Sequence, residues 1–584
     1  MSDPNVDSSN QPIDGADSII SDGNKSSGER SVVPRGRGHQ AFPVLGTEQI
    51  ERIAKWGIRE VLEDGVELFR RGQRRVDFFV VIRGKIEIYD FDCDQNRQVF
   101  VIHDAGQFTG EIDLFSNRKV LVGGCTCGTT EVLRLTHDEF QEVLSAEPDI
   151  GDIFVRAFIV RRLGILESNL GGSLLIGSHE DRETLAIQSF LRRNGYPVAT
   201  RYVDHVGDRE YISQVFKQQG LSEDRLPAFL CHGEAILIQP TLAQVAEAAG
   251  IIERPDTDKV YDMVVVGGGP GGMAAAVYGA SEGLSTVVLE AIAPGGQAGT
   301  SSKIENYLGF PTGLSGAELA GRAQIQAQKF GAVLALPVSV QGLSQEDQHY
   351  RLLTEDESSV CCRSIVIATG AKYRRLGLEN DQDFEGRGIH YACTAVEAGL
   401  CEGKPVGVVG AGNSAGQAAI YLSQRTEHVH LIVRGDSLAA SMSDYLIRRI
   451  DRSTNITVHF RCQVCQLAGS TGLREVTWDS QKTGNKQTEA IEHLFLMIGA
   501  SPNTVWLNQF VALDAKGFVQ TGGNGRSASE SHAWPLEREP MPFETSLPGI
   551  FAIGDVRSGS VKRVASAVGE GSVCVQYIHR HLSS

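Results

Sequence analysis

The sequence predicts a multidomain α/β protein, and three observations support that expectation. Two apolar runs are each followed by a glycine-rich turn, a helical stretch and a second apolar run, at residues 262–290 and 406–433. This alternation of strands and helices is typical of a parallel sheet covered by helices. Residues 42–170 instead hold many short strand-like runs broken by glycines, which indicates an all-β unit. The length of 584 residues suggests about three or four domains.

The composition sets limits on partners and setting. Residues 1–41 are rich in Ser, Asp, Asn and Gly, so we expect them to be disordered. A net charge of −17 and a pI near 5.4 argue against a nucleic-acid or anionic-membrane surface. No apolar stretch approaches the ~18 residues of a membrane span, and no signal-peptide pattern opens the chain. The eleven Cys are irregularly spaced, so we expect a cytoplasmic protein with neither a disulfide framework nor a metal site.

Residues 42–170 are expected to form a β-roll closed by two helices. The expected strands cover 67–69, 78–82, 85–89, 98–103 and 131–135, and the expected helices cover 138–145 and 150–166. After them, the segment Gly110-Glu111-Ile112-Asp113-Leu114-Phe115 completes a likeness to a known family. The unit resembles the cyclic-nucleotide-binding domain of bacterial catabolite activators and kinase regulatory subunits, and this segment matches the start of its phosphate-binding cassette.

The cassette departs from that family at its cation. The resemblance implies that Glu111 would hold a ribose hydroxyl and that an arginine further along would pair with the cyclic phosphate. Val120 and Leu121 stand at the arginine's position, and Arg118 is nearby but out of register. A buried phosphate without its cation would lose a charge-assisted hydrogen bond of ~1.5–3 kcal/mol. We therefore favour a docking or dimer-orienting module, with a cyclic nucleotide as the open alternative.

Residues 171–255, the middle unit, follow a third pattern. The expected order is strand 174–176, helix 183–194, strand 198–203, a polar helix, strands 226–230 and 235–238, and helix 242–249. This order resembles the thioredoxin/glutaredoxin fold, with Pro227 at the place of its cis-proline. The active-site position reads Gly177-Ser178-His179-Glu180-Asp181 and holds no Cys. Because disulfide exchange needs a thiolate there, we expect a redox-inactive unit in which His179 starts the helix and Cys231 belongs to the core.

The first glycine-rich segment has the parts of a dinucleotide site in the right order. Three glycines fill the G-x-G-x-x-G pattern between strand and helix: Gly267, Gly269 and Gly272. The first permits a tight turn, the second lets a pyrophosphate approach the backbone, and the third packs the helix on the strand. The helix start offers free N–H groups to phosphates. Glu290 ends the next strand, where its carboxylate can accept hydrogen bonds from ribose hydroxyls.

A second fingerprint lies further along the chain. Its turn contains Gly410, Gly412, Asn413, Ser414 and Ala415. Ala415 replaces the third glycine, which the pattern allows. Arg434 ends the following strand in place of an acid, and a cation there can meet a ribose 2′-phosphate, which favours NADPH over NADH. Two such fingerprints predict two Rossmann-like domains that hold two dinucleotides.

Residues 259–584 resemble the low-molecular-weight thioredoxin reductases. The likeness rests on Gly295-Gly296-Gln297 and on residues 304–311, 365–371, 497–503 and 548–556. It implies hydride transfer from NAD(P)H to FAD, and we expect a homodimer. It also implies a discontinuous FAD domain (256–378 and 501–584) around an NAD(P)H domain (379–500). Beyond the first turn, the implied FAD contacts are Gln297, Asn306, Thr369, Gly370, Gly554, Asp555, Val564 and Ala565.

One part of the family pattern is missing. In thioredoxin reductases a C-x-x-C pair takes electrons from the flavin. Here Ala392 and Ala395 stand at the two Cys positions, with Cys393 alone between them. One thiol cannot form an internal disulfide, so the dithiol relay does not carry over. His390 and Cys393 are nearest to the reactive position and are the candidate catalytic residues.

The acceptor therefore stays open among three hypotheses. The first is an NAD(P)H-dependent flavin oxidoreductase with a small-molecule or protein acceptor. The second is a thioredoxin-disulfide reductase with a relocated pair, Cys462 and Cys465, although strand alternation would turn these two Cys to opposite faces. The third is a regulatory binding protein in which FAD senses redox state and the β-roll senses a ligand.

Overall fold

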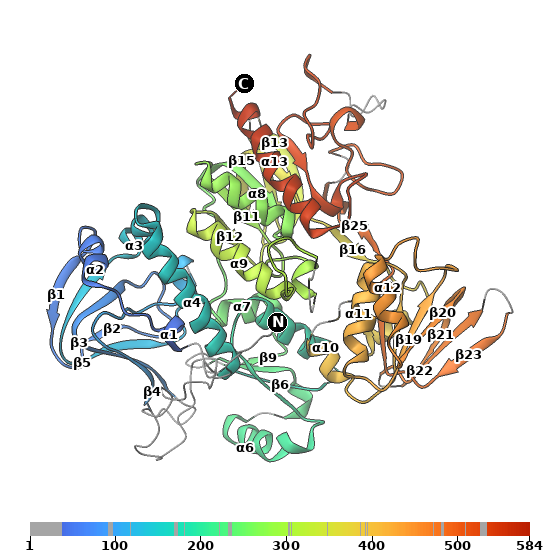
Figure 1. Ribbon diagram of the computed structural model, residues 1–584, viewed down its shortest axis with the longest axis horizontal. Coiled ribbons are helices and arrows are strands. Elements are labelled where there is room, and N and C mark those ends of the chain that lie inside the picture. The colour runs from blue at the N-terminus through green and yellow to red at the C-terminus, as the bar shows by residue number, and fades with distance from the viewer. Residues whose placement is uncertain are drawn as a thin grey trace, which may run out of the picture.

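The computed structural model describes residues 38–583 apart from 92–96, 117, 169–172, 180, 221, 232–235, 302–303, 305, 347–348, 386, 392, 394, 471, 481–483, 508–509 and 526–533. The segment expected to be disordered, 1–41, lies almost wholly outside the described residues. In Figure 1 the β-roll and the expected NAD(P)H domain lie on opposite sides of the middle unit and the expected FAD domain. In the part of the chain that the structure describes, no helix is both long and apolar enough to cross a membrane.

The β-roll is an antiparallel sheet closed by two helices. The sheet order is β1-β5-β3-β4, with β2 paired to β5. Its elements are α1 (Gly38–Ala41), α2 (Thr47–Ile53), β1 (Ile58–Leu62), β2 (Glu67–Phe69), β3 (Phe78–Phe91), β4 (Arg97–His103), β5 (Gly123–Leu135), α3 (His137–Ala146) and α4 (Pro148–Ser168). Aromatic rings from the sheet and both helices fill its core; the Phe78 ring centroid lies 4.7 Å from that of Phe140 and 4.9 Å from that of Phe154.

Glycines mislead the sequence prediction in this sheet. The two strands expected at 78–82 and 85–89 are one strand, β3, and β5 begins eight residues before its expected start at 131. Gly84 has φ +90° and bulges within β3, so pairing with β5 continues on both sides after a shift in register. Gly124 lies inside β5, where the Phe69 ring fills the space that a side chain would take. A Cβ at Gly124 would lie 2.5 Å from that ring. β1 was not expected at all.

The middle unit has the expected order of elements. These are β6 (Leu174–Gly177), α5 (Arg182–Arg193), β7 (Ala199–Tyr202), α6 (Arg209–Gln219), β8 (Ala228–Leu230), β9 (Leu237–Ile238) and α7 (Leu242–Ala248), with sheet order β7-β6-β8-β9. The Leu226–Pro227 peptide is cis. Cys231 is buried, as expected. His179 does not start the helix: α5 is capped by Asp181, and His179 Nδ1 lies 3.0 Å from Asp204 Oδ1 instead.

The expected FAD domain is built on one mixed sheet. Its strands are β10 (Val260–Val266), β11 (Thr286–Leu289), β12 (Val333–Ala335), β13 (Val340–Glu346), β14 (His349–Thr354), β15 (Ser359–Ile367) and β26 (Ile550–Ala552), and its helices are α8 (Pro270–Ser281), α9 (Gly316–Lys329) and α13 (Val564–Leu582). The order is β12-β11-β10-β15-β14-β13, and β26 pairs in parallel with β15. Because β26 returns from the far end of the chain, this fold is discontinuous.

The expected NAD(P)H domain is inserted between β16 (Ala371–Tyr373) and β25 (Ala500–Pro502), which pair with each other. Its parallel sheet has the order β17-β24-β18-β19-β20, and β21-β22-β23 forms a second, antiparallel sheet. The elements are β17 (Ile389–His390), α10 (Ala395–Leu400), β18 (Val406–Val409), α11 (Asn413–Ser423), β19 (Val429–Val433), α12 (Asp444–Asp451), β20 (Ile456–Phe460), β21 (Cys462–Ala468), β22 (Glu475–Ser480), β23 (Lys486–Glu489) and β24 (His493–Leu496).

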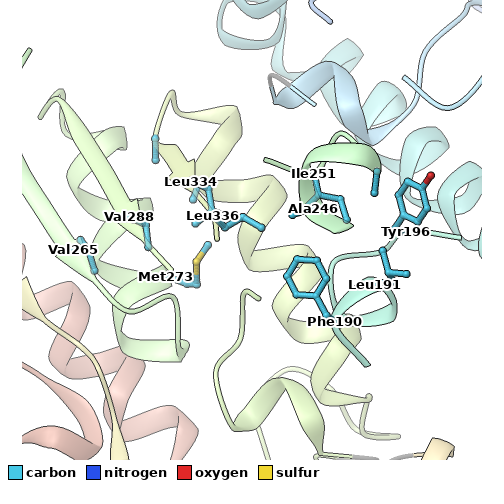
Figure 2. Packing of buried hydrophobic residues seen from close by; sticks show 14 of the residues in the cluster. Phe190, Leu191, Tyr196, Ala246, Ile251, Val265, Met273, Val288, Leu334 and Leu336 are labelled. Carbon is cyan, nitrogen blue, oxygen red and sulfur yellow. The ribbon is translucent and has the colours of Figure 1, made fainter. Parts of the chain in front are cut away.

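The middle unit and the expected FAD domain share one hydrophobic core. Figure 2 shows Phe190 and Ala246 of the middle unit next to Leu336, which follows β12. Leu121 of the β-roll belongs to the same buried cluster. Full burial of a side chain of this size contributes about 1.5–3 kcal/mol. The middle unit is therefore fixed on the FAD domain, whereas the NAD(P)H domain is joined through the β16–β25 connection.

Candidate dinucleotide sites

The turn after β10 has the shape that a pyrophosphate needs. Gly267 has φ +103°, and a Cβ there would lie 2.5 Å from the Ala368 carbonyl oxygen. A Cβ at Gly272 would lie 2.0 Å from the Gly267 carbonyl oxygen, so this glycine lets α8 pack on the turn. A Cβ at Gly269 would meet no atom within 4 Å. The residues present therefore fit a phosphate group at the N-terminus of α8.

The Glu290 carboxylate fixes the backbone of this turn through hydrogen bonds. Its side chain is buried, and Oε2 accepts a hydrogen bond from the Gly268 N–H at 2.7 Å. Oε1 accepts from the Ile292 and Ala293 N–H groups at 2.9 and 3.1 Å. These hydrogen bonds give Glu290 a structural role, and its ribose role stays a prediction. Since a carboxylate oxygen accepts more than one hydrogen bond, ribose hydroxyls can still be bound.

Several expected FAD contacts meet where the chain crosses to the NAD(P)H domain. Gln297 Nε2 donates to the Ala371 carbonyl oxygen on β16. Thr369 Oγ1 donates to the Asn503 carbonyl oxygen at 2.9 Å, and the Asn503 N–H donates to the Gly370 carbonyl oxygen at 3.1 Å. Segments distant in the sequence are thereby held together beside the first turn.

Asn306 lies in a separate loop. The Ile304 and Leu314 backbones pair across the base of that loop, with N–H to carbonyl distances of 2.7 and 3.1 Å. The Asn306 side chain is exposed. It is therefore available to a ligand, and its role as an FAD contact stays a prediction.

The C-terminal segment adds a second helix start to this side. Gly554 has φ +70°, and its N–H donates to Glu570 Oε2 at 2.7 Å. Burial raises the pKa of the neighbouring Asp555. Val564 opens α13, and Ala565 in its first turn is exposed. The first N–H groups of a helix have no partner within the helix, so they can face negative charge on a ligand.

The second glycine turn repeats the backbone of the first. Gly410 has φ +145°, and a Cβ there would lie 2.3 Å from the Met497 carbonyl oxygen. Gly412 caps α11, and the atom nearest to a Cβ on it would be 3.9 Å away. Ala415 is fully buried in the position of the third glycine. This turn too leaves room for a pyrophosphate.

The polar residues of the second turn are more open. Asn413 Oδ1 accepts a hydrogen bond from the Ser443 N–H at 2.7 Å, which ties α11 to the start of α12. Ser414 is exposed. Arg434 follows β19 directly and is also exposed. An exposed cation therefore follows β19 directly, and its contact with a 2′-phosphate stays a prediction.

The two candidate catalytic residues lie in core surroundings. His390 Nε2 is 3.0 Å from His493 Nδ1, and its ring stacks on Phe495. Burial lowers the pKa of His390 to about 4 and that of His493 to about 3, so both are neutral near pH 7. Cys393 is 7% exposed, and burial raises the pKa of its thiol. A protonated, buried thiol is a poor nucleophile.

The relocated Cys pair lies in β21, as the sequence predicts. Cys462 is buried and its Sγ donates to the Phe460 carbonyl oxygen at 3.4 Å. Cys465 is half-buried and its Sγ donates to the Thr477 carbonyl oxygen at 3.5 Å. The two thiols differ in exposure, and neither is in a disulfide.

Sequence reasoning missed one residue of the first site. Arg193, at the end of α5 in the middle unit, donates from Nη2 to the Gly296 carbonyl oxygen at 3.0 Å. A Cβ on Gly296 would lie 3.1 Å from the Cα of Gly269, so this contact borders the pyrophosphate position. Arg193 Nε is buried without a hydrogen-bond partner. Burial lowers the pKa of Arg193, and the nearby Glu290 carboxylate opposes that shift. No sequence pattern indicates a contact between positions so far apart.

Comparisons with known proteins agree with this geometry. Residues 261–571 match the family described as pyridine nucleotide-disulphide oxidoreductase, and residues 59–147 match the cyclic nucleotide-binding domain. The chain is 34% identical over 333 residues to NADPH-dependent thioredoxin reductase 3 of Arabidopsis thaliana, which covers 56% of this chain and 59% of the plant protein. It is 32% identical over 317 residues to a thioredoxin reductase of Mycoplasma genitalium, covering 54% of this chain and 93% of that protein.

The chain is also similar to a solved structure of a thioredoxin reductase. The crystal structure of T. acidophilum thioredoxin reductase is 28% identical, with a TM-score of 0.50. The similarity covers 56% of this chain and 99% of that one. The likeness therefore concerns the two dinucleotide folds.

Proposed function

The chain belongs to the pyridine nucleotide-disulphide oxidoreductase family, and we propose that it is an FAD-dependent NAD(P)H oxidoreductase of the thioredoxin reductase type. One observation carries the proposal: two glycine turns, each with room for a pyrophosphate, begin a helix on two sheets that the β16–β25 pair joins. The first turn would hold FAD and the second NAD(P)H. The bounds we propose for the domains are 256–378 with 501–584, and 379–500.

When bound, FAD would supply the redox chemistry between NAD(P)H and the electron acceptor. The residues of this chain would bind and orient the two dinucleotides. The N–H groups at the start of α8 face the pyrophosphate position, and Glu290 both fixes the turn and accepts from ribose hydroxyls. The first turn of α13 favours negative charge nearby. The remaining proposed FAD contacts are Gln297, Asn306, Thr369, Gly370, Gly554, Asp555, Val564 and Ala565.

NADPH is the proposed reductant. Arg434 is a cation at the end of β19 where an NADH site carries an acid. The Gly410–Ala415 turn, with Gly412, Asn413 and Ser414, would hold the NADPH pyrophosphate. A 2′-phosphate on the ribose would meet the Arg434 guanidinium, and NADH would lack that contact.

Electrons leave this protein without an internal dithiol relay in our proposal. Of the family's two Cys positions, 392 lies outside the described residues and is Ala, and 395 is Ala at the start of α10. Burial keeps the Cys393 thiol protonated. The acceptor that we propose is therefore external, a small molecule or a protein, with no Cys pair at positions 392 and 395 as an intermediate carrier.

Two alternatives remain. A thioredoxin-disulfide reductase would use Cys462 and Cys465, and the half-buried Cys465 is the feature in its favour. A regulatory binding protein would use FAD and the β-roll as sensors, and the match to a cyclic nucleotide-binding domain is the feature in its favour. Steady NADPH consumption with an added acceptor favours an enzyme over a sensor.

The other units have supporting roles in this proposal. The middle unit is a redox-inactive, thioredoxin-like unit that forms one wall of the FAD site through Arg193. A cyclic nucleotide is a poor fit in the β-roll, because Val120 and Leu121 are buried where the phosphate cation would stand and Glu111 lies 2.6 Å from Arg162. We also propose a homodimer in the cytoplasm; ten described Cys are free, which suits a reducing setting.

The decisive experiment is anaerobic reduction of the purified protein. We expect a yellow protein with about one FAD per chain whose flavin is bleached faster by NADPH than by NADH. A panel of quinones, small disulfides, thioredoxin and oxygen would then identify the acceptor. Protein that carries no flavin and consumes no NADPH would overturn the proposal. Light scattering during gel filtration tests the homodimer.

A further inference from the structure

Two arginines leave the sheet of the NAD(P)H domain side by side. β19 and β20 are parallel neighbours, and their last residues, Val433 and Phe460, are aligned (Figure 1). Arg434 and Arg461 are the next residues of the two strands. The Gly410 turn follows the neighbouring strand β18 at the same carboxyl edge. Since ligands of open parallel sheets bind outside this edge, Arg461 lies on the ligand side of the domain.

The Arg461 backbone has a conformation that residues with a side chain rarely adopt. Its φ is +56°, and it is the one residue between β20 and β21. Glycine adopts this left-handed conformation without strain, whereas a Cβ makes it unfavourable. Strained backbone of this kind is concentrated at functional sites. An arginine at this position therefore indicates a role for its side chain.

Two contacts hold Arg461 against the segment that begins with Arg434. The Arg461 N–H donates to the Gly435 carbonyl oxygen at 2.9 Å, and Arg461 Nη2 donates to Asp436 Oδ2 at 3.3 Å. A guanidinium has five N–H donors, so the contact with Asp436 leaves donors for a ligand. A Cβ on Gly435 would have only the Ser437 backbone within 4 Å, so the space beside this segment is open.

The charges at this edge suit a phosphate group. Arg434 is exposed and forms no ion pair with another residue that the structure describes. The side chains of Arg461 and Asp436 are 50% and 73% exposed, so their ion pair is open to water. Two cations and one carboxylate leave one net positive charge. A phosphate monoester carries a charge of about −1.5 to −2 at pH 7, and its three oxygens can accept from two guanidinium groups at once.

We propose that Arg461 is a specificity-determining residue for NADPH, which binds the ribose 2′-phosphate together with Arg434. The inference rests on the proposed function, because it concerns the dinucleotide of the second turn. Asp436 orients the Arg461 guanidinium, and the remaining donors bind the phosphate oxygens. NADH has a hydroxyl group in place of the 2′-phosphate, so neither cation favours it. Sequence spacing indicates Arg434 alone, whereas Arg461 joins it through the pairing of β19 with β20.

Isothermal titration of the flavin-loaded protein with NADP⁺ and NAD⁺ tests the proposal. These dinucleotides differ only in the 2′-phosphate, and neither can reduce the flavin. Arg461→Met removes the charge and keeps most of the side-chain length. We expect the dissociation constant for NADP⁺ to rise roughly fivefold, as for one exposed charge pair, and that for NAD⁺ to stay the same. Arg425→Met is the matched control, since Arg425 is exposed before β19 at the opposite edge of the sheet, and it should bind both as the parent does.

A second variant separates binding from folding. Arg461→Gly removes the side chain and suits the φ of +56°, so its Tm should be at least as high as that of Arg461→Met. It should nevertheless bind NADP⁺ as weakly as Arg461→Met does. Unchanged NADP⁺ affinity in either folded variant, or equal losses for NADP⁺ and NAD⁺, would overturn the role of Arg461 alone. Parent protein that binds neither dinucleotide would overturn the proposed function and this inference with it.

Discussion

The two glycine turns have the same backbone, yet their surroundings differ. The first is enclosed: Glu290 is 9% exposed behind it, and Arg193 of the middle unit reaches its rim. The second is open: Ser414 is exposed in the turn and Arg434 is exposed after the next strand. Enclosure strengthens each polar contact and slows release, whereas an exposed charge is screened by salt. In the function that we propose, this difference would separate a retained cofactor from an exchanging substrate.

The enclosure comes from outside the two Rossmann-like folds. The middle unit shares its hydrophobic core with the FAD domain, so Arg193 is held rigidly at the first turn. Asn194 adds a second link, since its Nδ2 donates to the Ile292 carbonyl oxygen at 3.0 Å beside Glu290. The second turn receives no such wall in the described structure.

The largest expected effect comes from Gly269→Val. A Cβ there meets no protein atom within 4 Å, and φ of −69° suits any residue, so the fold should persist while the side chain occupies the pyrophosphate position. We expect FAD content below about a tenth of the parent value, because the backbone can no longer approach the phosphates. Flavin absorbance per chain after purification measures it.

The matched control is Gly412→Val in the second turn, where the nearest atom to a Cβ is 3.9 Å away. This variant should keep its FAD and lose reduction by NADPH. If Gly269→Val retained full flavin, the first turn would not be the FAD site and the comparison between the two turns would fail.

Arg193→Met should weaken FAD binding less severely. The variant keeps most of the side-chain length but removes the charge at the rim of the first turn. Loss of one charge-assisted contact of ~1.5 kcal/mol predicts a rise of roughly tenfold in the FAD dissociation constant. Titration of deflavinated protein with FAD, followed by flavin fluorescence, measures it.

Arg192→Met is the control, because Arg192 is the adjacent residue on α5 and is exposed. It should bind FAD as the parent does. Equal weakening in both variants would mean a general disturbance of α5, and no weakening in either would remove the middle unit from the FAD site.

Arg434→Ala should have a smaller effect, which we expect on the KM for NADPH alone. An exposed charge contributes about 1 kcal/mol or less, so the KM for NADPH should rise roughly fivefold while that for NADH stays the same. The difference should shrink at high salt. Arg452→Ala, an exposed cation at the end of α12, serves as control. A loss shared equally by NADPH and NADH would remove the 2′-phosphate argument.

Both glycine turns were predictable because their requirements are local. Gly267 and Gly410 adopt positive φ in a fixed place between strand and helix, and sequence spacing records that place. The same logic failed at Gly84, which bulges inside β3 where a turn was expected. A glycine pattern in the sequence indicates which backbone conformations are possible. The contacts of that segment in the folded protein determine which conformation it adopts.

Contacts between units left no trace in the sequence. In the sequence, Arg193 is one of two adjacent arginines at the end of a helix. Its contact with Gly296 depends on the packing of the middle unit against the FAD domain. The surroundings of His390 and Cys393 were equally hidden. Their position near the family's reactive pair stays a prediction, and pairing of β17 with β24 buries His390 against His493.

The smallest expected effect is that of Cys393→Ser. The thiol is buried and protonated, and the flanking positions 392 and 395 are Ala, so the loop offers no sulfur partner. The rate of flavin reduction by NADPH should be unchanged in stopped-flow measurements.

Thiol titration under anaerobic conditions sharpens this result, because a dithiol relay would release two thiols when NADPH is added and a direct flavin route would release none. We expect none in either the parent or Cys393→Ser. Two new thiols in both proteins would assign the relay to a pair that excludes Cys393, with Cys462 and Cys465 as the pair of suitable spacing. Cys465→Ser would then abolish the release, and the open second domain would carry both the NADPH site and the disulfide that the enclosed flavin reduces.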